Sequence, residues 1–310
     1  MDSKFNSAMK QRILVTGCHG LLGQKLVEFL DPDFCELHGV DLQKENYFAE
    51  RKRYHYHCLD ITKRSEVIEL VRSIKPTWII NTAAMTAVDA CEFEKERCWQ
   101  INVTSVKHLV DAARRFDSRL IQISTDYVFD GEAGPYTELD RVNPISYYGK
   151  SKLAAENEIM GGGIDWVIAR TVVLFGHGRK LKPSFVHWLV STLKKGSEVK
   201  IVTDQISNVT LVDDFAKAIK KMVAFNKSGV FHISGREVIS RFDFAVKVAE
   251  FYDLDKSLIK PTITKLLGQP AKRPLQSGFV VDKAQKELDM KFCDVEEALQ
   301  LYRQEEAKFN

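Results

Sequence analysis

Two tyrosines and two lysines lie close together in the stretch PISYYGKSKLAAE, residues 144–156. The stretch has the features of a helix start, and on a helix residues four apart lie one turn above each other on the same face. Tyr148 and Lys152 have that spacing, whereas Tyr147 would be paired with Ser151 and Lys150 faces elsewhere. Tyr148 and Lys152 are therefore the two that can act together.

Such a pair is suited to acid catalysis. A tyrosine has a pKa of about 10 in water, which is too high for easy proton exchange near neutral pH. A lysine cation one turn away would stabilise the phenolate and lower that pKa. Tyr148 could then give a proton to a carbonyl oxygen while hydride arrives at the carbon. The same spacing also occurs by chance on solvated helix faces, so the pair needs support from the rest of the chain.

Two hydroxyl residues, Ser124 and Thr125, end a predicted strand within QISTDYVFDG, residues 122–131. The carboxyl end of a parallel strand faces the crevice in which open α/β sheets bind ligands. Thr125 could hydrogen-bond the carbonyl oxygen that Tyr148 protonates. Capping of the following loop is the alternative for both residues, and for Ser124 we favour it.

A glycine-rich loop, VTGCHGLLG, places Gly17, Gly20 and Gly23 after an apolar strand and before a helix. Glycine permits a tight turn and a close approach of the backbone to a pyrophosphate, and the helix N-terminus supplies N–H donors. We therefore predict a dinucleotide site, with a purely structural turn as the alternative.

The adenosine end of that site is expected near two acidic residues. Asp41 follows the second predicted strand, close to the spacing of an acid that binds the adenosine ribose. A carboxylate there would repel a 2′-phosphate and favour NADH, although Lys44, Arg51 and Lys52 nearby could soften the preference. Asp60, followed by an isoleucine, is placed to line the adenine pocket, and helix capping explains it nearly as well.

The elements that must position these groups alternate in type along the first half of the chain. Apolar β-rich runs at 12–17, 35–42, 78–84, 120–125 and 166–171 alternate with helical patterns at 21–30, 65–74 and 97–116. This alternation predicts an α/β fold with a doubly wound parallel, Rossmann-like sheet. We expect a dinucleotide-binding domain over 1–169 and a smaller substrate-binding region over 170–310, interleaved with returning Rossmann elements near 209–234.

The composition excludes several classes of protein. The 310 residues carry a net charge of +3, which is too small to indicate a nucleic acid or an anionic membrane as partner. The polar N-terminus does not resemble a signal peptide, and no apolar run is long enough to span a bilayer. The six cysteines lack metal-site spacing. We expect a cytoplasmic protein with reduced thiols and no metal.

Together the motifs resemble the extended short-chain dehydrogenase/reductase family, and within it the dTDP-4-dehydrorhamnose reductases. The resemblance covers nearly the whole chain and includes VTGCHGLLG, NTAAMTAVDACE, STDYVFDG, YYGKSKLAAE, TDQISNVTLVDDFA and KRPLQSGF. It implies reduction, with NADPH or NADH, of the 4-keto group of a nucleotide-linked 4-keto-6-deoxyhexose. The expected conversion is dTDP-6-deoxy-L-lyxo-4-hexulose to dTDP-L-rhamnose. The resemblance also allows a homodimer.

The resemblance assigns roles to individual residues. The catalytic positions are occupied by Thr125, Tyr148 and Lys152. The cofactor would be bound by Gly17, His19, Gly20, Leu21, Leu22, Gly23, Asp41, Asp60, Ile61, Ala83, Ala84, Tyr148 and Lys152. The substrate would be bound by Thr125, Asp126, Asn208 and Arg273, where a surface arginine is the alternative for Arg273 and a polar turn residue for Asn208.

Two departures and three rival functions stay open. Met85 stands where these reductases often have tyrosine, and the stretch 41–58 is longer than usual. A 4,6-dehydratase needs an Asp-Glu pair after the threonine, but Thr125 is followed by Asp126 and Tyr127. An epimerase is less firmly excluded. The regulatory subunit of methionine adenosyltransferase shows the same resemblance and binds a dinucleotide while acting on a partner.

Overall fold

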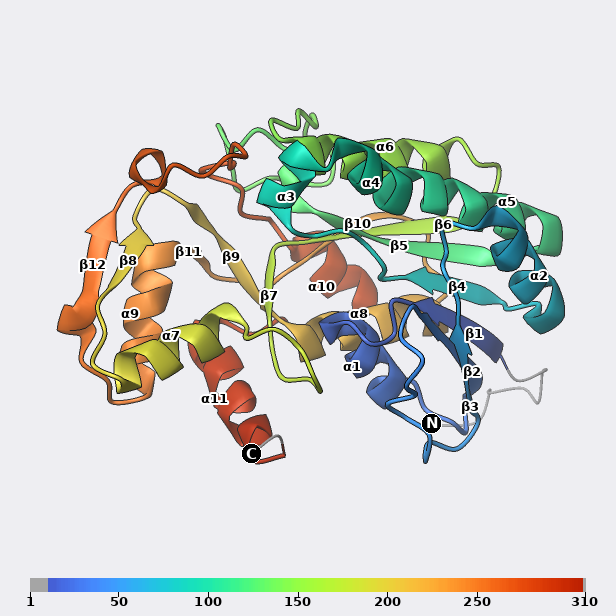
Figure 1. Cartoon of the computed structure of the whole chain (residues 1–310), viewed down its shortest axis with the longest axis horizontal. Coiled ribbons are helices and arrows are strands. Elements are labelled where there is room, and N and C mark those ends of the chain that lie inside the picture. The colour runs from blue at the N-terminus through green and yellow to red at the C-terminus, as the bar shows by residue number, and fades with distance from the viewer. Residues whose placement is uncertain (1–10, 309–310) are drawn as a thin grey trace.

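The computed structural model describes residues 11–308 and is built on a parallel seven-stranded sheet (Figure 1). The strand order is β10-β6-β5-β4-β1-β2-β3, which is doubly wound on either side of the β1–β4 pair. These strands are β1 Gln11–Thr16, β2 Cys35–Asp41, β3 Tyr54–Cys58, β4 Trp78–Asn81, β5 Arg119–Thr125, β6 Trp166–Thr171 and β10 Gly229–Ile233. Central strands such as β4 are buried along their whole length, as a sheet covered on both faces requires. The predicted fold class is confirmed.

Helices cover both faces of the sheet (Figure 1). One face is covered by α1 Leu21–Phe29, α8 Val212–Ala224 and α10 Asp282–Leu288, and the other by α2 Arg64–Ile74, α5 Ser105–Phe116 and α6 Tyr147–Met160. Each layer has its own buried cluster, with Leu26 and Phe215 in one and Val71 and Leu109 in the other. Among the described residues, no helix has the length and apolar character needed to cross a membrane.

The long helix predicted over 97–116 is interrupted. After α3 Val88–Phe93, the chain forms α4 Lys95–Trp99, a π-helical turn at Gln100–Thr104, and then α5. The wider turn buries Asn102, whose amide oxygen accepts a hydrogen bond from Met85 N at 2.8 Å and whose amide nitrogen donates to Met85 O at 3.1 Å. Asn102 thus holds the loop after β4, a role that a regular helical pattern does not reveal.

A second hydrophobic core lies beside the sheet, on the left of Figure 1. Its small sheets contain β7 Val173–Phe175, β9 Ile206–Leu211, β11 Val238–Ser240, β8 Val199–Val202 and β12 Ile259–Thr262. Its helices are α7 Phe185–Lys194, α9 Arg241–Phe251 and α11 Val295–Glu306, with short 3-10 turns at 256–258 and 264–267, whereas a further 3-10 turn at 126–128 follows β5 of the main sheet. The chain leaves the second core after β9, returns to the main sheet to form β10, and then enters the second core again at α9. The two cores are therefore not separate stretches of the sequence. The expected division near residue 169 stays a prediction.

Candidate active site

Two adjoining cavities open at the carboxyl ends of the central strands. The larger, of about 470 Å³, is lined by Gly20, Leu21, Leu22, Thr82, Ala84, Thr86, Val88, Ile123, Ser124, Thr125, Asp126, Tyr127, Tyr148, Lys152, Thr171, Val172, Val173 and Leu174. The smaller, of about 370 Å³, is lined by Gly17, His19, Gly20, Val40, Asp41, Leu42, Gln43, Leu59, Asp60, Ile61, Thr62, Thr82, Ala83, Ala84, Ile101 and Leu181. Gly20, Thr82 and Ala84 line both cavities, so together they form one elongated site.

The glycine loop lies where the two cavities meet. Two of its glycines determine the shape of the loop, and the third leaves space for a ligand. Gly17 has φ +68, and a Cβ at Gly23 would lie 2.2 Å from Gly17 O, so these two shape the loop itself. A Cβ at Gly20 would meet only Gly17 O, at 3.3 Å. Helix α1 begins there without a side-chain cap, which leaves N–H donors for a ligand. These residues fit a pyrophosphate at Gly20, and α1 would supply its donors.

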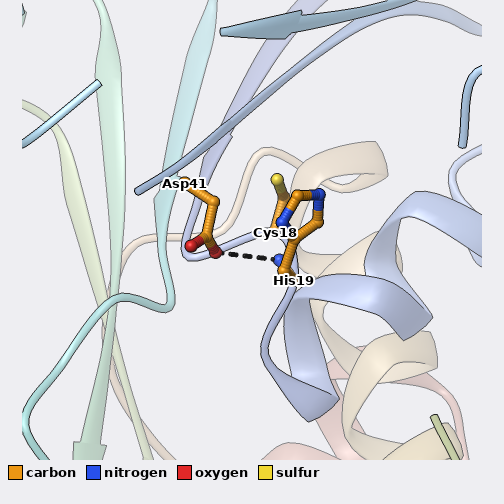
Figure 2. Close-up of side chains that lie close together, drawn as sticks. All are labelled: Cys18, His19 and Asp41. Carbon is orange, nitrogen blue, oxygen red and sulfur yellow. Dashed lines mark hydrogen bonds between the residues drawn. The ribbon is translucent and has the colours of Figure 1, made fainter. Parts of the chain in front are cut away.

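Asp41 holds the loop in place from the end of β2. Its carboxylate accepts hydrogen bonds from His19 N at 3.0 Å and from Leu42 N at 2.8 Å. Figure 2 shows the carboxylate directed at the backbone nitrogen of His19, with Cys18 beside the imidazole. Cys18, His19 and Asp41 are close enough to hold a metal ion. However, burial raises the pKa of the Cys18 thiol to about 12, so this sulfur is protonated near neutral pH.

The His19 ring forms a wall of the smaller cavity. It stacks on Tyr47 and Tyr56, with ring centroids 4.0 Å and 4.8 Å away. Neither of its ring nitrogens has a hydrogen-bond partner among the described residues, although the side chain is buried. This flat, partly unsatisfied surface beside Gly20 suits a nucleotide better than a metal ion.

The smaller cavity, where the adenosine end of a cofactor was expected, is lined by Asp41 and Asp60, and no lysine or arginine occurs among the described residues that line it. Arg51 was expected to soften the repulsion of a 2′-phosphate, but its guanidinium donates to Val27 O at 2.6 Å and to Leu30 O. It is therefore held against α1. Asp60 accepts a hydrogen bond from Thr62 N at 2.9 Å, so it caps the local turn while lining the cavity.

The structure brings Thr125, Tyr148 and Lys152 to one cavity and leaves Tyr147 outside its lining. Helix α6 begins as predicted, because the Ser146 hydroxyl accepts a hydrogen bond from Gly149 N at 3.1 Å. Tyr148 is only 8% exposed, and its phenol hydrogen-bonds with the Thr125 hydroxyl. The register of α6 thus selects Tyr148 over its neighbour.

The electrostatics of the pair differ from the prediction. Burial raises the pKa of the Tyr148 phenol, and the hydrogen bond with Thr125 only partly opposes this effect. Lys152 was expected to lower that pKa, but its Nζ donates to Ile123 O at 2.6 Å. Burial also lowers the pKa of Lys152 to about 8. Tyr148 is therefore a protonated donor at neutral pH, while Lys152 carries its charge below about pH 8.

Both hydroxyl residues at the end of β5 line the larger cavity, and it is Thr125 that also caps the loop. Thr125 caps the following turn, because its Oγ1 accepts a hydrogen bond from Tyr127 N at 3.2 Å and donates to Asp126 Oδ1 at 3.0 Å. Ser124, expected to be the capping residue, lines the cavity, and its hydroxyl has no hydrogen-bond partner among the described residues. Ser277 donates to Asp126 Oδ2 at 2.6 Å, which ties the cavity floor to the C-terminal part of the chain.

Two expected substrate ligands do not line the cavities. Asn208 is fully buried, donates to Gly235 O at 2.8 Å and accepts from Phe279 N at 2.6 Å, so its amide joins backbone segments. Arg273 forms two hydrogen bonds to the Asp89 carboxylate, at 2.7 Å and 2.8 Å. A polar residue in a sequence motif can thus serve the fold next to a site without entering it.

Several residues that line the larger cavity were not predicted from the sequence. Thr82 follows β4 and Thr171 ends β6, so both lie at carboxyl ends of strands in the sheet. The same rule that indicated Thr125 would have found them. Residues 172–174 lie where the chain leaves the main sheet for the second core, and no local pattern in the sequence indicated that crossing.

Residues 10–307 match the family described as RmlD substrate binding domain. The chain belongs to this family. A dTDP-4-dehydrorhamnose reductase from Aggregatibacter actinomycetemcomitans is 32% identical and covers 94% of this chain and 98% of that protein. The structure of dTDP-4-dehydrorhamnose reductase from Bacillus anthracis in complex with NADP has a TM-score of 0.86 at 31% identity, covering 96% and 100% of the two chains.

Membership of the RmlD family confirms the resemblance inferred from the motifs. The family match extends over both hydrophobic cores. The family also has a relative of another kind. Methionine adenosyltransferase 2 subunit beta of Danio rerio is 31% identical and covers 85% of this chain and 81% of that protein. Overall similarity therefore does not by itself distinguish a reductase from a regulatory subunit. The residues of the site are needed to tell the two functions apart.

Proposed function

We propose that the protein is an oxidoreductase that uses NADH or NADPH to reduce the 4-keto group of a nucleotide-linked 4-keto-6-deoxyhexose. The similarity to dTDP-4-dehydrorhamnose reductases leads us to dTDP-6-deoxy-L-lyxo-4-hexulose as substrate and dTDP-L-rhamnose as product. The observation that carries the proposal is a buried acid, Tyr148, beside Thr125 and Lys152 in a cavity that adjoins the uncapped N-terminus of α1.

In this mechanism the bound reduced nicotinamide supplies a hydride to the carbonyl carbon. Tyr148 gives its phenolic proton to the carbonyl oxygen. Thr125 hydrogen-bonds the same oxygen, exchanging its bond to Asp126 for one to the substrate. The Lys152 ammonium lies one helical turn away, and its charge would offset part of the cost of the phenolate that remains on the buried Tyr148. Solvent then returns the proton.

The direct test follows the absorbance of the reduced cofactor with a panel of 4-keto-6-deoxy sugar nucleotides that differ in sugar and base. Net oxidation of added cofactor with stoichiometric alcohol formation is expected. An epimerase would convert its substrate without net consumption of cofactor, and a dehydratase would eliminate water. Either of those results, with no reduction of any panel member, would reject the proposed reaction.

We also propose that NADH is used at least as well as NADPH, since two carboxylates and no described cation line the adenosine end. The ratio of kcat/KM for the two cofactors tests this, with Asp41→Ala as the comparison. A strong NADPH preference that Asp41→Ala leaves unchanged would show that Asp41 does not select the cofactor.

A second candidate function is that of a dinucleotide-binding regulatory subunit, which the similarity to methionine adenosyltransferase 2 subunit beta supports. It predicts a stoichiometric complex with a methionine adenosyltransferase catalytic subunit and no ketone reduction. Co-purification with that subunit, combined with the absorbance assay, separates the two functions.

The resemblance further leads us to propose a homodimer in the cytoplasm. All six cysteines are free thiols, which is consistent with a reducing compartment. Sedimentation equilibrium tests the assembly, and a mass of one chain at every concentration would count against a dimer.

A further inference from the structure

A cluster of histidines lies on the edge strand β3, away from the two cavities. Along β3, Tyr54 and Tyr56 face the α1 side, where they contact Cys18 and the His19 ring. Because side chains alternate along a strand, His55 and His57 point to the opposite face of the sheet.

The neighbouring strand places two further ligands on that face. β2 pairs with β3 in parallel, with His38 directly beside His55. Glu36 precedes His38 by two residues on β2, so its side chain points to the same face. One carboxylate and three imidazoles therefore meet across two strands.

The distances within this cluster match a metal site. Glu36 Oε1 lies 3.2 Å from His55 Nε2 and 3.4 Å from His38 Nε2. One ligand atom from each of the three residues lies within 4.8 Å of the others. For zinc bonds of about 2.0–2.1 Å, two ligand atoms of a tetrahedral site are about 3.3 Å apart. The three side chains thus already have nearly the spacing that a zinc ion needs.

An ion pair with Glu36 alone does not account for the surroundings of His38. Its side chain is 10% exposed, and its Nε2 has no hydrogen-bond partner among the described residues although Glu36 is near. An Nε2 without a hydrogen-bond partner that lies beside a carboxylate and a second imidazole has the surroundings of a metal ligand.

His57 orients the buried ring. Its Nε2 lies 3.1 Å from His38 Nδ1, and the two rings stack with centroids 5.4 Å apart. If Nδ1 carries the proton and donates to His57, then Nε2 is the nitrogen directed at Glu36 and His55. Metal-binding histidines commonly donate their second nitrogen in this way, which fixes the tautomer.

We propose that Glu36, His38 and His55 form a binding site for one divalent transition-metal ion of the Zn²⁺ type, with a fourth position open to water. Two imidazoles and one carboxylate are a ligand set that suits such ions and not Mg²⁺ or Ca²⁺, which prefer oxygen. The ion would cross-link the edge strand β3 to β2. This site does not depend on the proposed reductase activity.

The test measures Zn²⁺ binding to the purified, untagged full chain by equilibrium dialysis with metal analysis. Wild type is expected to retain a single Zn²⁺ ion. His55→Ala and Glu36→Gln alter side chains that are 53% and 42% exposed, so the fold should survive where a His38 variant would endanger it. We expect His55→Ala to weaken binding at least about 100-fold and His57→Phe about 10–100-fold.

Two controls guard against adventitious sites. His187→Ala removes an exposed histidine of α7, and Cys58→Ser removes the exposed thiol at the end of β3. Both should bind Zn²⁺ like wild type, and the Co²⁺ complex should lack thiolate-to-metal absorption. Absence of Zn²⁺ binding to wild type, equal binding to the His55→Ala and His187→Ala variants, or loss of binding in Cys58→Ser would each overturn the proposal.

Discussion

Adjacent tyrosines have opposite surroundings on α6. Tyr148 is buried in the cavity beside Thr125, whereas Tyr147 contacts Lys95, whose Nζ lies 5.6 Å from the ring, and Trp99. Tyr148→Phe should lower kcat by about 10²–10⁴-fold, the usual contribution of a general acid, while cofactor affinity is kept. Tyr147→Phe is the matched control and should remain close to wild type. An inactive Tyr147 variant with an active Tyr148 variant would mean that the wrong tyrosine is assigned.

Asp126 is predicted to make stability depend on pH. Burial raises its pKa to about 6, more than its hydrogen bonds with Ser277 and Thr125 lower it. Since the folded state binds this proton more tightly, the stabilisation is fully present below about pH 4 and is lost as pH rises through about 6. A shift of this size corresponds to about 3 kcal/mol at most.

The Asp126→Asn variant keeps the shape and much of the hydrogen bonding but cannot ionise. Relative to wild type, its free energy of unfolding should therefore increase between pH 4 and pH 7 and should match wild type near pH 4. Urea unfolding at several pH values measures that difference. A difference that does not change with pH would show that Asp126 has an ordinary pKa.

For individual residues, the sequence predicted which side chains lie in the site better than it predicted their pKa values and hydrogen-bond partners. Helical spacing identified Tyr148 and Lys152, yet the predicted lowering of the Tyr148 pKa was wrong because burial dominates. The sequence carries no direct measure of burial or of a long-range acceptor such as Ile123 O. For the same reason it could not tell that Asn208 is occupied by backbone groups.

In the glycine loop between β1 and α1, substitutions at Gly20 and Gly23 are predicted to have different effects on cofactor binding and on stability. A side chain at Gly20 would enter the cavity, whereas one at Gly23 would meet the backbone of Gly17 and Cys18 at 2.2 Å and 2.7 Å. Gly20→Val should therefore weaken cofactor binding at least tenfold with little change in Tm. Gly23→Ala should lower stability by about 1–3 kcal/mol through overpacking.

Titration of NADH fluorescence and thermal unfolding monitored by circular dichroism measure the two effects on the same samples. If both variants bound cofactor like wild type, the pyrophosphate would have to lie elsewhere. If Gly20→Val unfolded the protein while Gly23→Ala did not, the two glycines would have been assigned in reverse.

Elements with clear apolar periodicity were predictable, and polar or short ones were not. β1, β2, β4, β5 and β6 follow from their buried runs. β3 has the sequence YHYHC, which reads as a loop until its pairing with β2 is known. The histidine cluster depends on that register, so motif spacing along the chain gave no sign of a metal site.

A buried cation connects the two hydrophobic cores. Lys25 of α1 is 1% exposed, and its Nζ lies 2.6 Å from Glu305 of α11 and 3.4 Å from Asp213 of α8. α1 and α8 cover the main sheet, while α11 belongs to the second core. Lys25 thus links the C-terminal helix by charge to the helices that cover the main sheet.

Glu305→Gln should therefore destabilise the whole molecule. The variant keeps the length of the side chain but leaves Lys25 with one negative partner fewer in a buried place, which costs about 1–3 kcal/mol. Glu250→Gln is the control, because Glu250 pairs with Lys256 at 2.6 Å between side chains that are 52% and 62% exposed. An exposed pair of this kind contributes about 0–1 kcal/mol. Urea unfolding measures both variants, and equal losses would mean that Lys25 does not join the cores energetically.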